Sequence, residues 1–209
     1  MNWQLVSFFG DSTVLLPSAA ALFIVLFLRT PSRQLSWQWG LLFGITGAIV
    51  CASKLAFMGW GLGIRELDFT GFSGHSALSS AFWPIFLWLL CARGTPSLRR
   101  SSAVAGYSLA GLVGYSRLVI HAHSTSEVIA GLLLGASISA LFLVLQSRSS
   151  RIVDAQLSWG GLFSLIVIPV VLLNTGTKAP TQSLLGEIAV KIGPLEKPFT
   201  RADLHKHFY

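Results

Sequence analysis

Residues 114–131 read GYSRLVIHAHSTSEVIAG and separate two apolar runs of the chain. The stretch contains four ionisable side chains, those of Arg117, His121, His123 and Glu127. Ionisable groups are expensive to place near lipid, so we expect them to serve a function. The order Ser124-Thr125-Ser126-Glu127 fits a capping box, with Ser124 as the N-cap. We therefore predict a polar loop that joins two helices, the second beginning close to His123.

The rest of the chain is dominated by apolar residues. Of its 209 residues, 53% are hydrophobic and 11% are charged, and the mean hydropathy is +0.67. Soluble domains contain about 25% charged residues, so this composition indicates a membrane protein. Six apolar runs cover residues 13–28, 37–58, 75–91, 102–115, 128–145 and 157–173. We predict an all-α fold, a polytopic membrane bundle of about six transmembrane helices that forms one domain over residues 1–173.

The basic residues lie between the apolar runs and not on one soluble face. For that reason the net charge of +7 does not indicate a nucleic-acid partner. With six spans, three connections face the same side, and they carry mainly arginines: Arg29, Arg33, Arg93, Arg99, Arg100, Arg148 and Arg151. The positive-inside rule places that side in the cytoplasm. We therefore expect a multi-pass protein of a bacterial inner membrane, with the other connections and both termini facing the periplasm or exterior.

The tail, residues 174–209, differs from the preceding runs in its mixed charge and its prolines. Its apolar residues Leu184, Leu185, Ile188 and Ile192 have the spacing of one face of a short surface helix. A loosely ordered tail is the alternative, because the prolines limit the length of any helix. We treat the tail as a segment separate from the membrane domain.

Two further features lie on the expected outward side. Lys54 falls inside the second apolar run, where a lysine indicates a function unless it lies near the helix end and extends to water. The stretch GFSGHSALSS, residues 71–80, places Ser73, Gly74 and His75 at the expected start of a helix. A helix N-terminus offers free N–H groups to a phosphate, and a glycine lets the backbone approach it closely. An ordinary turn with a capping serine explains the same residues.

Helical spacing sorts the ionisable residues of the opening stretch into pairs. On one continuous helix Arg117 would share a face with His121, and His123 would share another with Glu127. Arg117 and His123 would meet only if the chain bends between them. Glu127 has two candidate roles, either capping the helix or holding one ring nitrogen of His123 as the third group of a triad does. A metal site at His121 and His123 is disfavoured, because no further ligand is suggested nearby.

The same stretch resembles a motif of the type 2 phosphatidic acid phosphatase (PAP2) superfamily. Ser116 and Arg117, followed after five residues by His123 and after three more by Glu127, are similar to its third motif, S-R-x5-H-x3-D. Glu127 stands where the family has aspartate. It keeps the charge but adds a methylene, so either the helix or the imidazole has to shift to compensate.

Two preceding stretches resemble the other motifs of that family. The sequence F-S-G-H at residues 72–75 is similar to the second motif, P-S-G-H, with phenylalanine in place of proline. Lys54 and Arg65 are candidates for the first motif, K-x6-R-P, although ten residues separate them here and Glu66 follows in place of proline. The matched motifs run from Lys54 to Glu127, and the tail lies outside the resemblance.

The resemblance implies a membrane lipid phosphatase that needs no metal ion and no other cofactor. In such an enzyme His123 would be the nucleophile that forms a phosphohistidine, and Glu127 would orient it. His75 would protonate the leaving oxygen and then activate water. The implied phosphate-binding residues are Lys54, Arg65, Ser73, Gly74 and Arg117.

The expected site lies at a membrane surface, flanked by Trp60, Phe69 and Phe72. Aromatic residues are common at the lipid–water interface, so a lipid phosphate or pyrophosphate held in the bilayer is the expected substrate and partner. Undecaprenyl pyrophosphate and phosphatidic acid both fit. A lipid phosphotransferase would use the same site to phosphorylate a second lipid, and a transporter or lipid-binding homologue would use none of this chemistry. The sequence does not indicate an oligomeric state.

Overall fold

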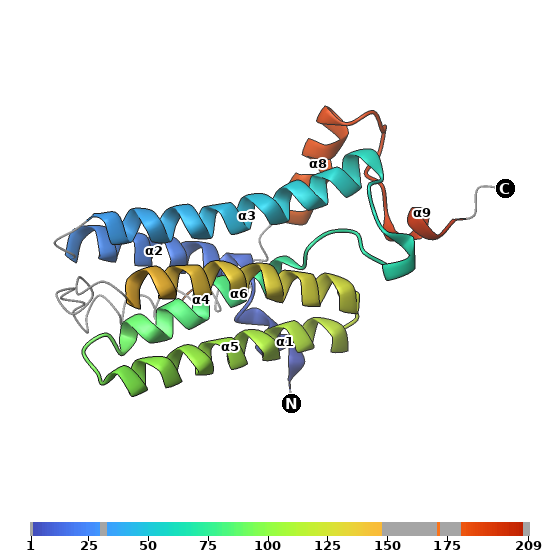
Figure 1. Cartoon of the computed structure of the whole chain (residues 1–209). Coiled ribbons are helices and arrows are strands. Elements are labelled where there is room, and N and C mark those ends of the chain that lie inside the picture. Colours follow the sequence, from blue (N-terminus) through green and yellow to red (C-terminus); the bar gives the residue numbers. More distant parts are fainter. Residues whose placement is uncertain (1, 30–32, 148–170, 172–180, 207–209) are drawn as a thin grey trace.

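The computed structural model describes residues 2–29, 33–147, 171 and 181–206 (Figure 1). Within these ranges there are helices and no strand, apart from an isolated bridge between Ile64 and Phe69, so the predicted all-α fold is confirmed. The helices are α1 Trp3–Phe8, α2 Ser12–Arg29, α3 Gln34–Trp60, the 3-10 turn η1 Arg65–Leu67, α4 Gly74–Leu90, α5 Pro96–Val119, α6 Thr125–Ser147, α8 Thr181–Ile192 and α9 Arg201–His205.

Helices α2 to α6 coincide with the first five apolar runs. The sixth run and the arginines at positions 148 and 151 lie outside the described residues, except for Val171, so the number of six spans and the division at residue 173 stay predictions. Helix α1 was not predicted, because six residues are too few for a periodic pattern. It begins after Asn2, whose side chain accepts a hydrogen bond from the backbone N–H of Gln4 at 3.1 Å.

Three helical segments of the described chain are long and apolar enough to cross a membrane. They are Trp3–Leu28, Gln34–Trp60 and Thr125–Ser147. Helix α4 is 17 residues long, and α5 carries Arg99 and Arg100 near its start. The three apolar segments support association with a membrane, whereas the number and direction of crossings stay predictions.

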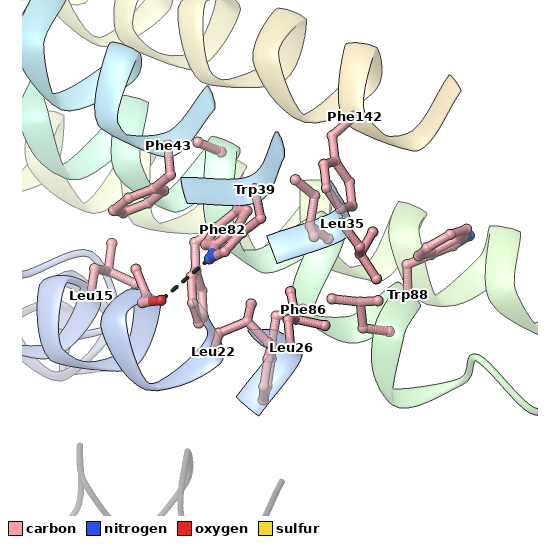
Figure 2. Packing of buried hydrophobic residues seen from close by; sticks show 14 of the residues in the cluster. Leu15, Leu22, Leu26, Leu35, Trp39, Phe43, Phe82, Phe86, Trp88 and Phe142 are labelled. Atoms are coloured by element: carbon pink, nitrogen blue, oxygen red, sulfur yellow. Dashed lines mark hydrogen bonds between the residues drawn. The ribbon is translucent and has the colours of Figure 1, made fainter. Parts of the chain in front are cut away.

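Helix α4 is the central helix of the bundle and packs against α2, α3, α5 and α6 (Figure 1). Most of its residues are buried, three serines among them, which is typical of a helix surrounded by others. Figure 2 shows the core beside it, where the ring of Trp39 lies 5.9 Å from Phe82 and 6.3 Å from Phe142. The indole N–H of Trp39 donates to the carbonyl of Ala19 at 3.3 Å, which ties α3 to α2 and satisfies this buried donor.

Two glycines, Gly131 and Gly135, allow α6 to lie directly against α4. A Cβ at Gly131 would lie 2.7 Å from the carbonyl oxygen of Ser73. A Cβ at Gly135 would lie 2.1 Å from the carbonyl oxygen of Ala77. This close packing fixes the start of α6, and therefore Glu127, against the start of α4.

Replacing Gly135 by alanine is expected to destabilise the protein by about 1–3 kcal/mol, because the added methyl group forces the two backbones apart. Gly111→Ala is the matched control, since a Cβ there meets no atom of the described residues within 4 Å and alanine favours a helix by about 1 kcal/mol. Thermal unfolding of the detergent-purified proteins measures both effects. Equal melting temperatures for the two variants would contradict the packing argument.

Both end segments of the described chain reach the same end of the bundle (Figure 1). Helix α1 packs against α5, and α8 packs against α3. Beyond α8, the backbone N–H of Phe199 donates to the carbonyl of Met58 at 2.8 Å, and its ring lies 5.5 Å from that of Phe57. Residues from both ends of the sequence therefore surround the region where α3, α5 and the loop before α6 meet.

Candidate active site

A cavity of about 950 Å³ opens at this end of the bundle. It is lined by the corner between α1 and α2, the ends of α3 and α5, the start of α4, the loop before α6 and the C-terminal segment. Five of the predicted site residues line it, namely Lys54, Gly74, His75, Arg117 and His123. The bundle thus brings together side chains that come from four different stretches of the sequence.

His123 and Glu127 form a close pair at the start of α6. Helix α5 ends at Val119, the chain reverses at His121 with φ of 52°, and α6 begins at Thr125. Nδ1 of His123 lies 2.7 Å from Oε2 of Glu127. A carboxylate only accepts hydrogen bonds, so Nδ1 donates and the lone pair of the neutral ring is on Nε2. The bend also brings Arg117 and His123 to one cavity, whereas His121 is exposed and does not line it.

Glu127 also caps the helix. Its Oε2 accepts from the backbone N–H of Ser124 at 3.2 Å, and the Ser124 hydroxyl accepts from the backbone N–H of Glu127 at 3.4 Å. The predicted capping box is therefore present, and a single carboxylate oxygen both caps the helix and contacts the imidazole. Glu127 is fully buried, so it does not line the cavity and acts through His123.

The surroundings of His123 favour its neutral form. Burial lowers the pKa of His123 most strongly, while the hydrogen bond to Glu127 raises it, and the balance lies below the usual histidine value. Lys54 and Arg117 lower this pKa further by charge repulsion. At neutral pH the ring therefore carries a free lone pair on Nε2.

His75, at the first turn of α4, faces a partner that the sequence analysis missed. Its Nε2 lies 3.5 Å from Oδ2 of Asp11, at the corner between α1 and α2. Asp11 is itself held by the backbone N–H of Thr13, which donates to Oδ1 at 2.8 Å. The one available signal was that Asp11 is the sole acidic residue before Glu66 in an otherwise apolar region. The site therefore contains two histidine–carboxylate pairs.

Two cations line the cavity near these pairs. Nη1 of Arg117 donates to the hydroxyl of Ser7 at 2.6 Å, while its buried Nε has no hydrogen-bond partner among the described residues. Nζ of Lys54 donates to Oε1 of Gln182 on α8 at 3.2 Å. Lys54 is partly buried in this structure, so it is not simply extended into solvent. Both side chains offer donors to an anion in the cavity.

Two predicted phosphate-binding residues, Ser73 and Arg65, do not line the cavity. Ser73 is fully buried as the N-cap of α4, where its hydroxyl accepts from the hydroxyl of Ser76 at 2.9 Å, and it does not line the cavity. Its backbone N–H donates to the carbonyl of Glu127 at 3.1 Å, which joins the starts of α4 and α6. Arg65 is exposed in η1 and lies outside the cavity lining.

A further arginine, Arg201, lines the cavity from the C-terminal segment. Its Nη2 donates to both carboxylate oxygens of Glu127 at 2.8 Å each. The sequence analysis missed this contact, because nothing in a charged tail indicates which of its basic residues returns to a distant loop. The local signal was a capping box, since Thr200 and Asp203 flank Arg201 and start a short helix there.

No group of three or more His, Cys, Asp or Glu side chains in the described part of the chain is arranged to hold a metal ion. Most of the ionisable side chains that line the cavity are cationic or imidazole groups. Such a set suits an anion such as a phosphate.

The fold and the site together define a membrane-associated helical protein with two histidines and three cationic side chains around one cavity. Residues 63–151 match the model of the PAP2 superfamily. The chain is also 74% identical over 206 residues, 99% of each chain, to an uncharacterized 22.5 kDa protein in the cps region of Klebsiella pneumoniae. No solved structure matches the chain significantly.

The chain belongs to the PAP2 superfamily, so the resemblance seen in the motifs is confirmed. Membership of this superfamily supports a phosphatase-type function. The matched residues include His75, Arg117, His123 and Glu127, whereas Asp11, Lys54 and Arg201 lie outside them.

Proposed function

We propose that this protein is a lipid phosphate phosphatase that works through a phosphohistidine on His123 and requires no metal ion. The observation that carries the proposal is the cavity shared by His123, His75, Lys54 and Arg117, in which each histidine has its own carboxylate. A phosphoryl group needs a nucleophile, a proton donor and compensating positive charge, and this cavity offers all three.

In the first step, Nε2 of neutral His123 attacks phosphorus and the bond from phosphorus to the leaving oxygen breaks. Protonated His75 gives its proton to that oxygen, and the negative charge of Asp11 partly offsets the burial that disfavours the protonated ring. Glu127 accepts the hydrogen bond from Nδ1 and stabilises the positive charge that develops on the His123 ring.

In the second step, neutral His75 takes a proton from a water molecule, and the resulting hydroxide attacks phosphorus. The phosphorus–nitrogen bond breaks, its electron pair returns to Nε2 of His123, and inorganic phosphate leaves. Lys54, Arg117 and the backbone N–H of Gly74 neutralise the phosphoryl oxygens in both steps. Ser73 supports Gly74 by capping the same helix, and a direct role of Arg65 would require its side chain to move into the cavity.

The apolar part of the cavity favours a lipid as the source of the phosphate. Leu16 of α2, Val50 of α3 and Leu78 of α4 line it on the side of the bundle core. A headgroup at the histidines would leave its hydrocarbon chain beside these residues. Undecaprenyl pyrophosphate and phosphatidic acid-type lipids are the substrates we propose.

The arginine positions support an outward-facing site in a multi-pass protein of a bacterial inner membrane. Arg93 and Arg99 lie at the connection between α4 and α5, at the opposite end of these helices from His75 and Arg117. By the positive-inside rule the arginine end is cytoplasmic, and the cavity then faces the periplasm.

A phosphate-release panel tests the function. The purified full-length protein in detergent is expected to release phosphate from at least one of phosphatidic acid, phosphatidylglycerol phosphate and undecaprenyl pyrophosphate, and to keep this activity in excess chelator. Loss of activity that added zinc or magnesium restores would overturn the metal-free mechanism. Transfer of labelled phosphate to an added acceptor lipid would identify a phosphotransferase, and inactivity on the whole panel would favour a binding or transport role.

A further inference from the structure

The C-terminal segment, residues 198–206, completes the site through Arg201. We infer that Arg201 is a positioning residue that fixes the buried Glu127 carboxylate and balances its charge, so that His123 stays neutral and able to attack. The inference rests on the proposed role of His123. It adds a residue from outside the stretch matched by the family model.

The contacts of Arg201 leave the carboxylate little freedom. Nη2 binds Oε1 and Oε2 of Glu127, each at 2.8 Å, while Nη1 binds the carboxylate of Asp68 and its backbone carbonyl, the latter at 3.2 Å. Oε1 also accepts from the backbone N–H of Thr70 at 2.8 Å and from its hydroxyl. Oε2 also accepts from the backbone N–H of Ser124 and from Nδ1 of His123. Five donor groups therefore surround a carboxylate that is 0% exposed, and one of them, Nη2 of Arg201, contacts both oxygens.

The segment that carries Arg201 is anchored on both sides of it. Before it, Phe199 is bonded through its backbone to Met58 and packs against Phe57. After it, Nε2 of His205 lies 2.7 Å from Oδ1 of Asp68. The short helix between these anchors is closed by the capping box of Thr200 and Asp203. The guanidinium is therefore held in place by the fold of the segment, unlike a lone surface ion pair.

The contact between Arg201 and Glu127 affects His123 through the balance of charge. A buried carboxylate requires a compensating positive charge. Arg201 supplies it permanently, so the pair of Arg201 and Glu127 is neutral while His123 is uncharged. Without Arg201, His123 is the only one of the described groups bonded to the carboxylate that can become cationic. Protonation would then be favoured, and an imidazolium has no lone pair with which to attack phosphorus.

Several other charged groups face this pair and also influence the protonation of His123. On the other elements around His123 these are Lys54, His75 and Arg117. Asp68 and His205 lie on the far side of Arg201. Lys54 and Arg117 also oppose protonation of His123. Removing Arg201 therefore takes away one of three nearby positive charges, namely the one that directly contacts Glu127.

The test is Arg201→Gln in the full-length protein, followed by two readouts. We expect the acid limb of the kcat/KM profile on a short-chain phosphatidic acid to move up by about one pH unit, as nearby charges do. Activity at pH 6 should then fall more than activity at pH 8, and the difference should approach tenfold at pH values well below the limb. Arg201→Lys keeps the charge and should move the limb less. Lys206→Gln is the matched control, since it removes a charge from the exposed end of the same segment.

The second readout is the pKa of His123 itself, followed by NMR on protein labelled in its histidine rings, with His123→Ala to assign the signal. A rise of about one unit in Arg201→Gln supports the inference even if no lipid phosphate is hydrolysed, in which case only the proposed function fails. An unchanged His123 pKa in a folded, active Arg201→Gln protein overturns the inference. Uniform loss of activity at every pH, with an unchanged melting temperature, overturns it as well.

Discussion

Replacing His123 by alanine is expected to abolish phosphate release from lipid phosphates, with a fall in kcat of about 10⁴-fold or more. The substitution removes the nitrogen that we propose as the nucleophile. His121→Ala is the matched control, because His121 lies two residues away, is exposed and does not line the cavity. It should keep most of the activity.

The measurement is phosphate release together with acid-labile, base-stable label on the protein after mixing with a ³²P-labelled lipid phosphate. Wild type and His121→Ala should both carry the label transiently, and His123→Ala should carry none. Equal loss of activity in the two variants would contradict the assignment of His123. Full activity of His123→Ala would do so more directly.

The second large effect is expected for His75→Ala, which should lose about 10²- to 10⁴-fold in kcat on a lipid phosphate. In the proposed mechanism the leaving oxygen needs a proton. Among the described histidines, only His75 lines the cavity and contacts a carboxylate other than Glu127. p-Nitrophenyl phosphate has a leaving group that departs without a proton. On this substrate the first step should survive, and the second, which needs His75 to activate water, should not.

His75→Ala should therefore release a burst of p-nitrophenol equal to the amount of enzyme and then accumulate the phosphohistidine. Asp11→Asn leaves the ring in place and weakens only its protonated form, so it should show the same pattern with a smaller loss. A His75→Ala protein that turns over lipid phosphate at the wild-type rate would exclude the proton-donor role. Equal losses on both substrates without a burst would place its effect in the first step alone.

The features that could be predicted from sequence are those encoded over a few residues. The bend before α6 follows from the capping box at Ser124 and Glu127, and the contact of His123 with Glu127 follows from their spacing of four residues. The apolar runs predicted α2 to α6, because helices that pack together in a bundle bury mainly apolar residues.

The contacts that were missed join parts of the chain that are distant in sequence. Asp11 meets His75 only because the corner between α1 and α2 packs beside α4, and Arg201 meets Glu127 only because Phe199 anchors the segment to α3. No local pattern records either arrangement. The motif made Ser73 a candidate phosphate ligand, whereas in the structure its hydroxyl is hydrogen-bonded within the cap of α4. The sequence does not show whether this side chain points to the cap or to the cavity.

The two ends of α4 and α5 lie at different distances from the cavity, and this matters for changes made to the protein for expression and purification. Both end segments of the described chain bring side chains to the cavity, Asp11 from one and Arg201 from the other, so a truncation that removes either segment also removes a side chain of the candidate site. A fragment trimmed to residues 63–151 would keep the motif histidines and lose both of these side chains. The connection between α4 and α5, far from the cavity, is the better place for an inserted epitope.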